Sequence, residues 1–261
     1  MTNRIKKTFE NLQLNDKKGI ILYLTTGIPD NQTTASLALE LFEQGADIIE
    51  LGIPFSDPLA DGVTIQQSSQ KALELGVNVD ICFDVCSIIR EKNDKNPIVL
   101  MGYYNPILQY GLANFISKAK SCGVDGIIVP DLPLEESLNL LEKCTFADIN
   151  LIYLIAPTTS TKRIKEICKN ANGFLYCVSV AGITGARNTV STEGIDLVQV
   201  VKQYTKVPVA LGFGISTKSQ LEEVNKHADA GIIGSALVNI ILNSNTNDVI
   251  ANATNFLKDL K

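Results

Sequence analysis

The sequence contains no tryptophan and a single histidine, His227. One histidine without a clustered partner argues against serine–histidine catalysis and against a histidine-bound metal ion. His227 stands beside Lys226 and close to Asp229, and we expect a surface or capping role for it. Any acid–base chemistry is therefore expected to use carboxyl groups.

Long apolar segments are also missing. A membrane-spanning helix needs about 18 apolar residues or more, whereas Ile20–Leu24 is typical of the longest apolar runs here. The segment Met1–Asp16 includes Glu10 and has no apolar core, which argues against a signal or transit peptide. We expect a soluble protein with no membrane partner.

The chain has no excess of positive charge. Its 261 residues carry a formal net charge of -5, which argues against a nucleic-acid binder that works by bulk electrostatics. Hydrophobic residues at 45% and charged residues at 20% are ordinary values for a globular protein, so general disorder is excluded.

The six cysteines show neither a disulfide nor a zinc pattern. A chain of this length needs no covalent cross-links, and nothing in it indicates secretion. Cys82 and Cys86 stand four apart on an expected helix, without a second cysteine or histidine pair at zinc spacing. We therefore expect reduced, structural thiols and no metal site.

Short β-branched apolar runs alternate with amphipathic helical patterns along the whole chain. Most runs are continuously apolar, as expected for parallel strands covered on both faces. No linker interrupts the pattern, so we predict one domain, 1–261, with the fold of a (β/α)8 TIM barrel. An open doubly wound sheet is the alternative. The eight expected strands are Gly19–Thr26, Asp47–Pro54, Pro97–Tyr104, Gly126–Asp131, Leu151–Ala156, Gly173–Val180, Val207–Phe213 and Ala230–Gly234.

Helix positions can be predicted in several segments. Ile5, Phe9 and Leu12 have helical spacing, which indicates an extra N-terminal helix that covers the floor of the barrel. Gly45 and Gly123 each stand between a helical pattern and a strand, where glycine suits a left-handed helix end.

Active sites of such barrels lie at the carboxyl ends of the strands. The seventh expected strand runs into Gly212–Ser216, and the eighth ends at Gly234, which with Ser235 opens a short expected helix. Glycine lets backbone N–H groups approach an anion, and a helix N-terminus favours negative charge. We interpret this as a phosphate site; tight turns without a ligand are the alternative.

The segment after the sixth expected strand is long, polar and rich in small residues. Gly182–Thr189 has the composition of a mobile lid. Arg187 within it is a candidate phosphate ligand, and an ion pair inside the loop or an exposed side chain are equally open readings.

Two carboxyl groups are candidates for catalysis. Glu50 interrupts an apolar strand, where loss of water raises the pKa of a carboxyl group toward neutrality. Asp61 ends a loop rich in proline and aspartate that is placed to reach over the barrel mouth. A buried salt bridge for Glu50 and a capping role for Asp61 are the structural alternatives.

Several motifs together resemble the tryptophan synthase alpha-subunit family. The motifs are LGIPFSDPLADG at 51–62, AGITGAR at 181–187, GFGIS at 212–216 and the pair Gly234–Ser235. The resemblance runs from about residue 20 to 236, and the proline–aspartate loop is its most specific part. Ile53, Val63 and Ile183 depart from the common pattern, and Val63 removes a backbone restraint where proline is frequent.

The resemblance implies a lyase of tryptophan biosynthesis that cleaves indole-3-glycerol phosphate to indole and glyceraldehyde 3-phosphate. It implies that Glu50 is the acid–base residue and that Asp61 stabilises the indole N–H. It assigns the phosphate to Gly185, Phe213, Gly214, Gly234 and Ser235. It places Tyr23, Leu100 and Phe213 beside the indole ring, Tyr176 near Glu50 and Thr184 in the closing loop.

The resemblance also implies a partner, a β subunit that carries pyridoxal phosphate, in an α2β2 heterotetramer. This chain itself is expected to need no cofactor. The segments 54–61, 103–110 and 131–135 would face the partner, and segment 182–192 would close on ligand binding. The location implied is the cytoplasm of a bacterium, or the stroma if the gene is in a plastid.

Three other functions stay open at this point. The chain could be a non-catalytic activator of a β subunit, although Glu50 and Asp61 argue against that. It could be a free-standing lyase that releases indole without a partner. It could be another sugar-phosphate barrel enzyme, which would need a metal or a His/Lys constellation that the sequence does not show.

Overall fold

A twisted parallel sheet forms the centre of the computed structural model, which describes residues 3–179, 192–212 and 214–261. All eight strand pairings in it are parallel, in the order β5-β4-β3-β2-β1-β9-β8-β7-β6. The strands are β1 (Gly19–Thr25), β2 (Ile48–Gly52), β3 (Ile98–Met101), β4 (Gly126–Ile128), β5 (Asn150–Ile152), β6 (Leu154–Ile155), β7 (Leu175–Val178), β8 (Val209–Gly212) and β9 (Ala230–Ile233).

The sheet closes into a barrel at Tyr153. The fifth expected strand is divided there, because β5 pairs with β4 whereas β6 pairs with β7. The backbone N–H of Tyr176 on β7 donates to the carbonyl of Tyr153 at 3.0 Å, which joins the two edges. The two pieces therefore act as one barrel strand, the predicted TIM barrel is confirmed, and the open sheet is excluded.

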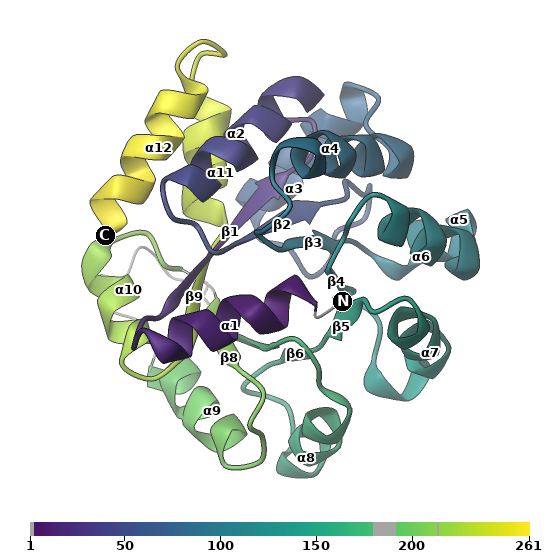
Figure 1. Cartoon of the computed structure of the whole chain (residues 1–261), viewed down its shortest axis with the longest axis vertical. Coiled ribbons are helices and arrows are strands. Elements are labelled where there is room, and N and C mark those ends of the chain that lie inside the picture. Colours follow the sequence, from purple (N-terminus) through teal and green to yellow (C-terminus); the bar gives the residue numbers. More distant parts are fainter. Residues whose placement is uncertain (1–2, 180–191, 213) are drawn as a thin grey trace.

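Helices surround the sheet, as Figure 1 shows. The helices from the first half of the chain are α2 (Asn31–Glu43), α3 (Val63–Glu74), α4 (Val79–Lys92), α5 (Tyr104–Tyr110) and α6 (Leu112–Ser121). Those that follow are the 3-10 turn η1 (Leu134–Glu136), α7 (Leu138–Phe146), α8 (Thr161–Asn170), α9 (Thr192–Lys202), α10 (Lys218–Asn225), α11 (Ser235–Asn243) and α12 (Val249–Leu260).

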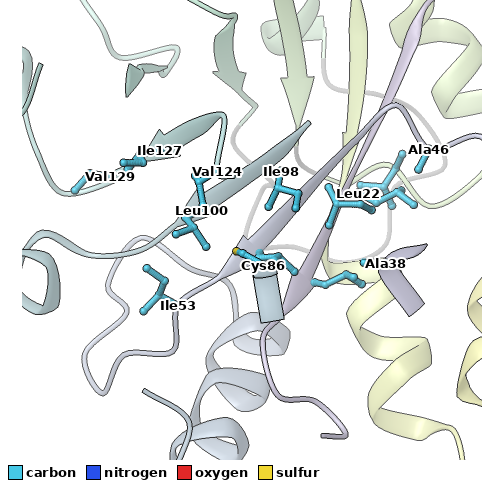
Figure 2. Close-up of a cluster of buried hydrophobic side chains, with 14 of the residues drawn as sticks. Leu22, Ala38, Ala46, Ile53, Cys86, Ile98, Leu100, Val124, Ile127 and Val129 are labelled. Carbon is cyan, nitrogen blue, oxygen red and sulfur yellow. The ribbon is translucent and has the colours of Figure 1, made fainter. Parts of the chain in front are cut away.

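Side chains alternate between two separate apolar layers along each strand. On β1, Ile21 faces the barrel interior while Leu22 and Leu24 face the helices. Figure 2 shows part of the outer layer, which includes Leu22 of β1, Ile98 of β3 and Cys86 of α4. Burial on both faces explains why the strands read as continuous apolar runs.

The predicted N-terminal helix is α1 (Arg4–Leu14), and it covers one end of the barrel. Figure 1 shows it lying across the ring of strands. Ile5 is fully buried, and the ring of Phe9 lies 5.9 Å from that of Phe174 inside the barrel. This closes the N-terminal end, so within the part of the chain that the structure describes the interior opens toward the carboxyl ends of the strands.

Three aspartates hold the amino ends of neighbouring strands together in the same way. Asp47, Asp125 and Asp229 each stand directly before a strand. The backbone N–H of each aspartate donates to the carbonyl of one residue on the previous strand, and its carboxylate accepts from the N–H of that same residue. The three residues bonded in this way are Ile20, Ile98 and Val209. Two of these aspartates follow a helix-ending glycine with positive φ, Gly45 at 95° and Gly123 at 75°, as predicted. The repeated helix–glycine–aspartate unit therefore sets strand register.

Asp125 is the most deeply buried of the three, and Asp125→Ala is expected to lower the free energy of unfolding by about 3 kcal/mol. Its carboxylate contacts Arg4, Arg90 and the N–H of Ile98, each at 3.0 Å, and it is 3% exposed. Loss of the carboxylate leaves the arginine charges and the N–H without their partner. Urea unfolding measures the effect.

The control for this prediction removes an exposed ion pair. Glu166 contacts Lys169 on the surface of α8, and exposed pairs contribute little. Glu166→Ala should therefore unfold close to the wild-type midpoint. Equal losses in the two variants would show that the Asp125 network does not stabilise the barrel more than an ordinary surface pair.

Candidate active site

A cavity of about 1090 Å³ lies at the carboxyl ends of the strands. Most of the described candidate residues line it: Tyr23, Glu50, Asp61, Tyr176, Gly214, Gly234 and Ser235. They come from β1, β2 and β7 and from the segments that follow β2, β8 and β9. The fold therefore brings residues from distant parts of the sequence to one end of the barrel, where such enzymes place their sites.

Glu50 lies on the inward face of β2. It stands beside Tyr23 of β1 and Val99 of β3 in the strand register, and it is 1% exposed. Neither carboxyl oxygen has a hydrogen-bond partner within the described part of the chain. The salt bridge considered as an alternative is therefore not seen among these residues.

The pKa of Glu50 is raised to about 8, and burial is the cause. Without a partner for the charged form, loss of water is not compensated. At neutral pH Glu50 is therefore held mainly as the uncharged acid. A carboxyl group with this pKa can donate a proton at neutral pH and take one back.

Asp61 lies on the loop after β2 and is half-buried. Burial raises the pKa of its carboxyl group, and a hydrogen bond from the hydroxyl of Tyr103 lowers it, so the net pKa lies above the ordinary value. The hydroxyl donates to Oδ2 of Asp61 at 3.0 Å. Asp61 does not cap α3, whose N-cap is Gly62 without a side-chain hydrogen bond.

The loop that carries Asp61 is anchored at its other end. The hydroxyl of Ser69 on α3 accepts from the N–H of Phe55 at 2.9 Å and donates to the carbonyl of Phe55 at 3.1 Å. The ring of Phe55 stacks on Tyr103, with centroids 5.2 Å apart. These contacts restrict the loop despite the absence of proline at Val63.

The phosphate end of the candidate site is built from backbone. Helix α11 begins at Ser235, and its N-cap Gly234 provides no side-chain hydrogen bond. The N–H groups of its first turn therefore have no intrahelical acceptor and are available to an anion. Gly185, Phe213, Thr184 and Arg187, together with most of the predicted closing segment, lie outside the described residues.

The prediction for Leu100 is wrong, and the structure gives Met101 in its place. Leu100 is fully buried in the outer apolar layer between sheet and helices, where Figure 2 shows it near Val124. Met101, the next residue on β3, lines the cavity. Because strand side chains alternate, an error of one position moves a residue to the other face.

The other sequence expectations concern residues away from the cavity. All six cysteines are free and buried, as predicted. His227 lies at the surface, 3.5 Å from Glu223. Within the ranges that the structure describes, no group of histidines, cysteines and carboxylates could hold a metal ion, and no helix could span a bilayer.

Gly52→Ala is expected to weaken ligand binding in the cavity while the barrel still folds. A Cβ at this position would overlap the hydroxyl and ring of Tyr23, which is 9% exposed and borders Glu50. The ring would have to move into the cavity. We expect thermal unfolding to show a modest loss of stability and ligand binding to weaken at least about ten-fold.

A matched control is Gly62→Ala, because a Cβ there meets nothing within 4 Å. It should bind ligand nearly as the wild type does. If Gly52→Ala behaves like Gly62→Ala in the binding assay, the position of the Tyr23 ring does not limit the cavity.

Known proteins were compared with the chain as a whole. A family model described as tryptophan synthase alpha chain matches residues 9–260. A tryptophan synthase alpha chain of Thermoanaerobacter sp. (strain X514) is 46% identical over 260 residues, which cover 99% of this chain and 98% of the relative.

Solved structures agree. Tryptophan synthase subunit alpha from Legionella pneumophila str. Paris superposes with a TM-score of 0.92 at 37% identity, covering 100% of this chain and 97% of that one. A chain in a tryptophan synthase complex from Pyrococcus furiosus has a TM-score of 0.86 at 38% identity, covering 93% and 97%. Sequence, fold and cavity therefore agree, and the chain belongs to the tryptophan synthase alpha chain family.

Proposed function

We propose that this protein is a lyase that cleaves indole-3-glycerol phosphate to indole and glyceraldehyde 3-phosphate. The observation that carries the proposal is Glu50, a buried carboxyl group that faces the cavity with a pKa of about 8. Family membership supports the same reaction. A second carboxylate and a helix N-terminus complete the chemistry that this substrate needs.

The cavity offers a place for each part of the substrate. The phosphate lies at the N-terminus of α11, beside Gly234 and Ser235, where the helix dipole favours an anion. The indole ring lies between Tyr23 and Met101, with Tyr176 near Glu50. This placement puts the glycerol chain, and the bond to be broken, next to Glu50.

Cleavage begins with proton transfer from Glu50 to C3 of the indole ring. The ring becomes an iminium ion, which is a better acceptor for the electrons of the breaking bond. The Glu50 carboxylate then takes the proton of the hydroxyl on the carbon attached to C3. The carbon–carbon bond breaks, its electrons return to the ring, an aldehyde forms, and Glu50 is again protonated.

Asp61 stabilises the charge that appears on the ring. Protonation at C3 places positive charge on the indole nitrogen, whose N–H then becomes a stronger donor. A carboxylate beside the indole N–H lowers the energy of the charged intermediate, and the effect is largest where water is excluded. Asp61 borders the same cavity as Glu50.

The proposed reaction needs no cofactor on this chain. Proton transfer between Glu50 and the substrate accounts for every bond made and broken. No lysine is found among the described residues that line the cavity, so none is placed there to bind pyridoxal phosphate covalently. We assign pyridoxal phosphate to the β subunit alone.

Members of this family work with a β subunit, and we propose an α2β2 heterotetramer for this one. The segments predicted to face the partner meet on the surface at a hollow of about 370 Å³, lined by Phe55, Asp57, Leu59, Tyr103, Asn105 and Asp131 among others. Leu59 is 93% exposed there, and a partner seated on this hollow would cover it. Because the curated relatives are bacterial, we place the protein in a bacterial cytoplasm rather than a plastid.

The test is release of indole from indole-3-glycerol phosphate by the purified chain, alone and with a tryptophan synthase β subunit. Weak release that rises sharply with the β subunit supports the proposal. Equally strong release without it indicates a free-standing lyase. No indole in either case, with β activity still raised by the chain, indicates a non-catalytic activator and contradicts the proposed reaction.

A further inference from the structure

The hydroxyl group of Tyr103 bonds to both the backbone and a side chain of the Asp61 loop. The hydroxyl accepts from the backbone N–H of Ala60 at 2.9 Å and donates to Oδ2 of Asp61 at 3.0 Å. Because the Ala60 N–H occupies an acceptor site of the oxygen, the hydroxyl proton is directed to Asp61. Sequence reasoning assigned this tyrosine only to a partner-facing segment.

The tyrosine itself is held firmly in place. It is 5% exposed, and its ring stacks on Phe55, whose backbone is bonded to Ser69 of α3. It precedes α5, and the N–H of the next residue, Tyr104, donates to Asp131 at 2.9 Å. The hydroxyl therefore stands on a rigid support that also joins the segments after β3 and β4.

We propose that Tyr103 is a positioning residue that holds the Asp61 carboxylate toward the indole N–H, and that it thereby sets how well Asp61 stabilises the charged ring. The proposal rests on the proposed function. A carboxylate on a loop can rotate about two side-chain bonds, and a hydrogen bond from a fixed donor selects one orientation before the substrate binds.

The hydrogen bond has a second consequence, for ionisation. It lowers the pKa of Asp61, against the rise that burial causes. The titratable groups around the pair are Tyr23, Tyr176 and Glu50 on the barrel side, and Asp57 and Asp131, which line the surface hollow with Tyr103. Arg163 is the one basic residue among the described residues that line the cavity, and it is paired with Glu135 at 2.6 Å. The Tyr103 hydroxyl, which bonds directly to Asp61, is therefore a main support of the charged form.

Tyr103→Phe tests the proposal in the complex with the β subunit. Phenylalanine keeps the stacked ring and removes the hydroxyl. We expect kcat for indole release to fall about ten-fold or more, with a smaller change in KM. The acidic limb of the kcat/KM profile should move to higher pH, because the pKa of Asp61 rises without its donor.

Thr33→Val is the control for loss of a hydroxyl group. The hydroxyl of Thr33 also donates to an aspartate, Asp30, at 2.6 Å, but neither residue lines the cavity or lies in a segment predicted to face the β subunit. This variant should keep the wild-type kcat and the wild-type acidic limb. Thermal unfolding of both variants shows whether a loss of activity reflects a loss of structure.

A double variant separates positioning from a general structural role. If Tyr103 acts through Asp61, adding Tyr103→Phe to Asp61→Asn should lower kcat far less than it does alone. An unchanged kcat and acidic limb in Tyr103→Phe, or full multiplicative losses in the double variant, overturns the role of Tyr103 and leaves the proposed function standing. An inactive wild-type complex overturns both.

Discussion

Glu50→Gln is expected to lower kcat for indole release by about a thousand-fold, because general acid–base catalysis by one positioned group contributes about 10²- to 10⁴-fold. Glutamine has nearly the same shape and no acidic proton. It cannot protonate C3 of the ring or remove the proton of the hydroxyl, so both proton transfers fail. A discontinuous assay of indole at saturating substrate measures the loss.

Substrate binding is the internal control for that variant. The phosphate site at Gly234 and Ser235 does not depend on the charge of Glu50, so the affinity for glyceraldehyde 3-phosphate should change little. Glu91→Gln, an exposed carboxyl group on α4, should keep full activity. A Glu50→Gln enzyme with more than a tenth of the wild-type kcat would contradict the acid–base role.

The same substitution is expected to stabilise the protein at high pH. The pKa of Glu50 rises from 4.5 to about 8 on folding. Below pH 4.5 the group is protonated in both states, and its contribution to stability is fully present. As pH rises from 4.5 to 8, the unfolded chain releases a proton that the folded chain keeps, so stability is lost. Above pH 8 the loss is complete.

The size of that loss follows from the shift in pKa, which corresponds to at most about 5 kcal/mol. Glutamine does not titrate. Between pH 5 and pH 9 the free energy of unfolding of Glu50→Gln should therefore rise, relative to that of the wild type, by up to this amount. Urea unfolding at both pH values measures the difference. If the difference in free energy of unfolding between the two proteins is the same at pH 5 and pH 9, Glu50 is not buried without a charge partner.

The closed barrel could be predicted because its strands and helices each carry a local signal. Continuous apolar runs and helix-ending glycines gave the order of elements, and Ile5 and Phe9 gave the helix on the floor. The division of the fifth strand at Tyr153 had no such signal. It depends on which neighbour each half pairs with, and that is a property of closure.

The location of the candidate carboxyl groups could also be predicted, for a physical reason. A glutamate inside an apolar strand stands out, and its burial is the cause of its raised pKa. The contacts that orient Asp61 could not be predicted, since Tyr103 is distant in sequence and nothing marks its hydroxyl. Leu100 was misplaced because its neighbour Met101 is equally apolar, and only the register distinguishes their faces.

One measurement tests most directly whether an uncharged Glu50 begins the cleavage of indole-3-glycerol phosphate. It is the pH dependence of kcat/KM for indole release by the complex with the β subunit, between pH 6.5 and 9.5. Because kcat/KM reports the ionisation of the free enzyme, it should be level at neutral pH and fall about ten-fold per pH unit above about 8. A value that stays level up to pH 9.5 would contradict Glu50 as the acid.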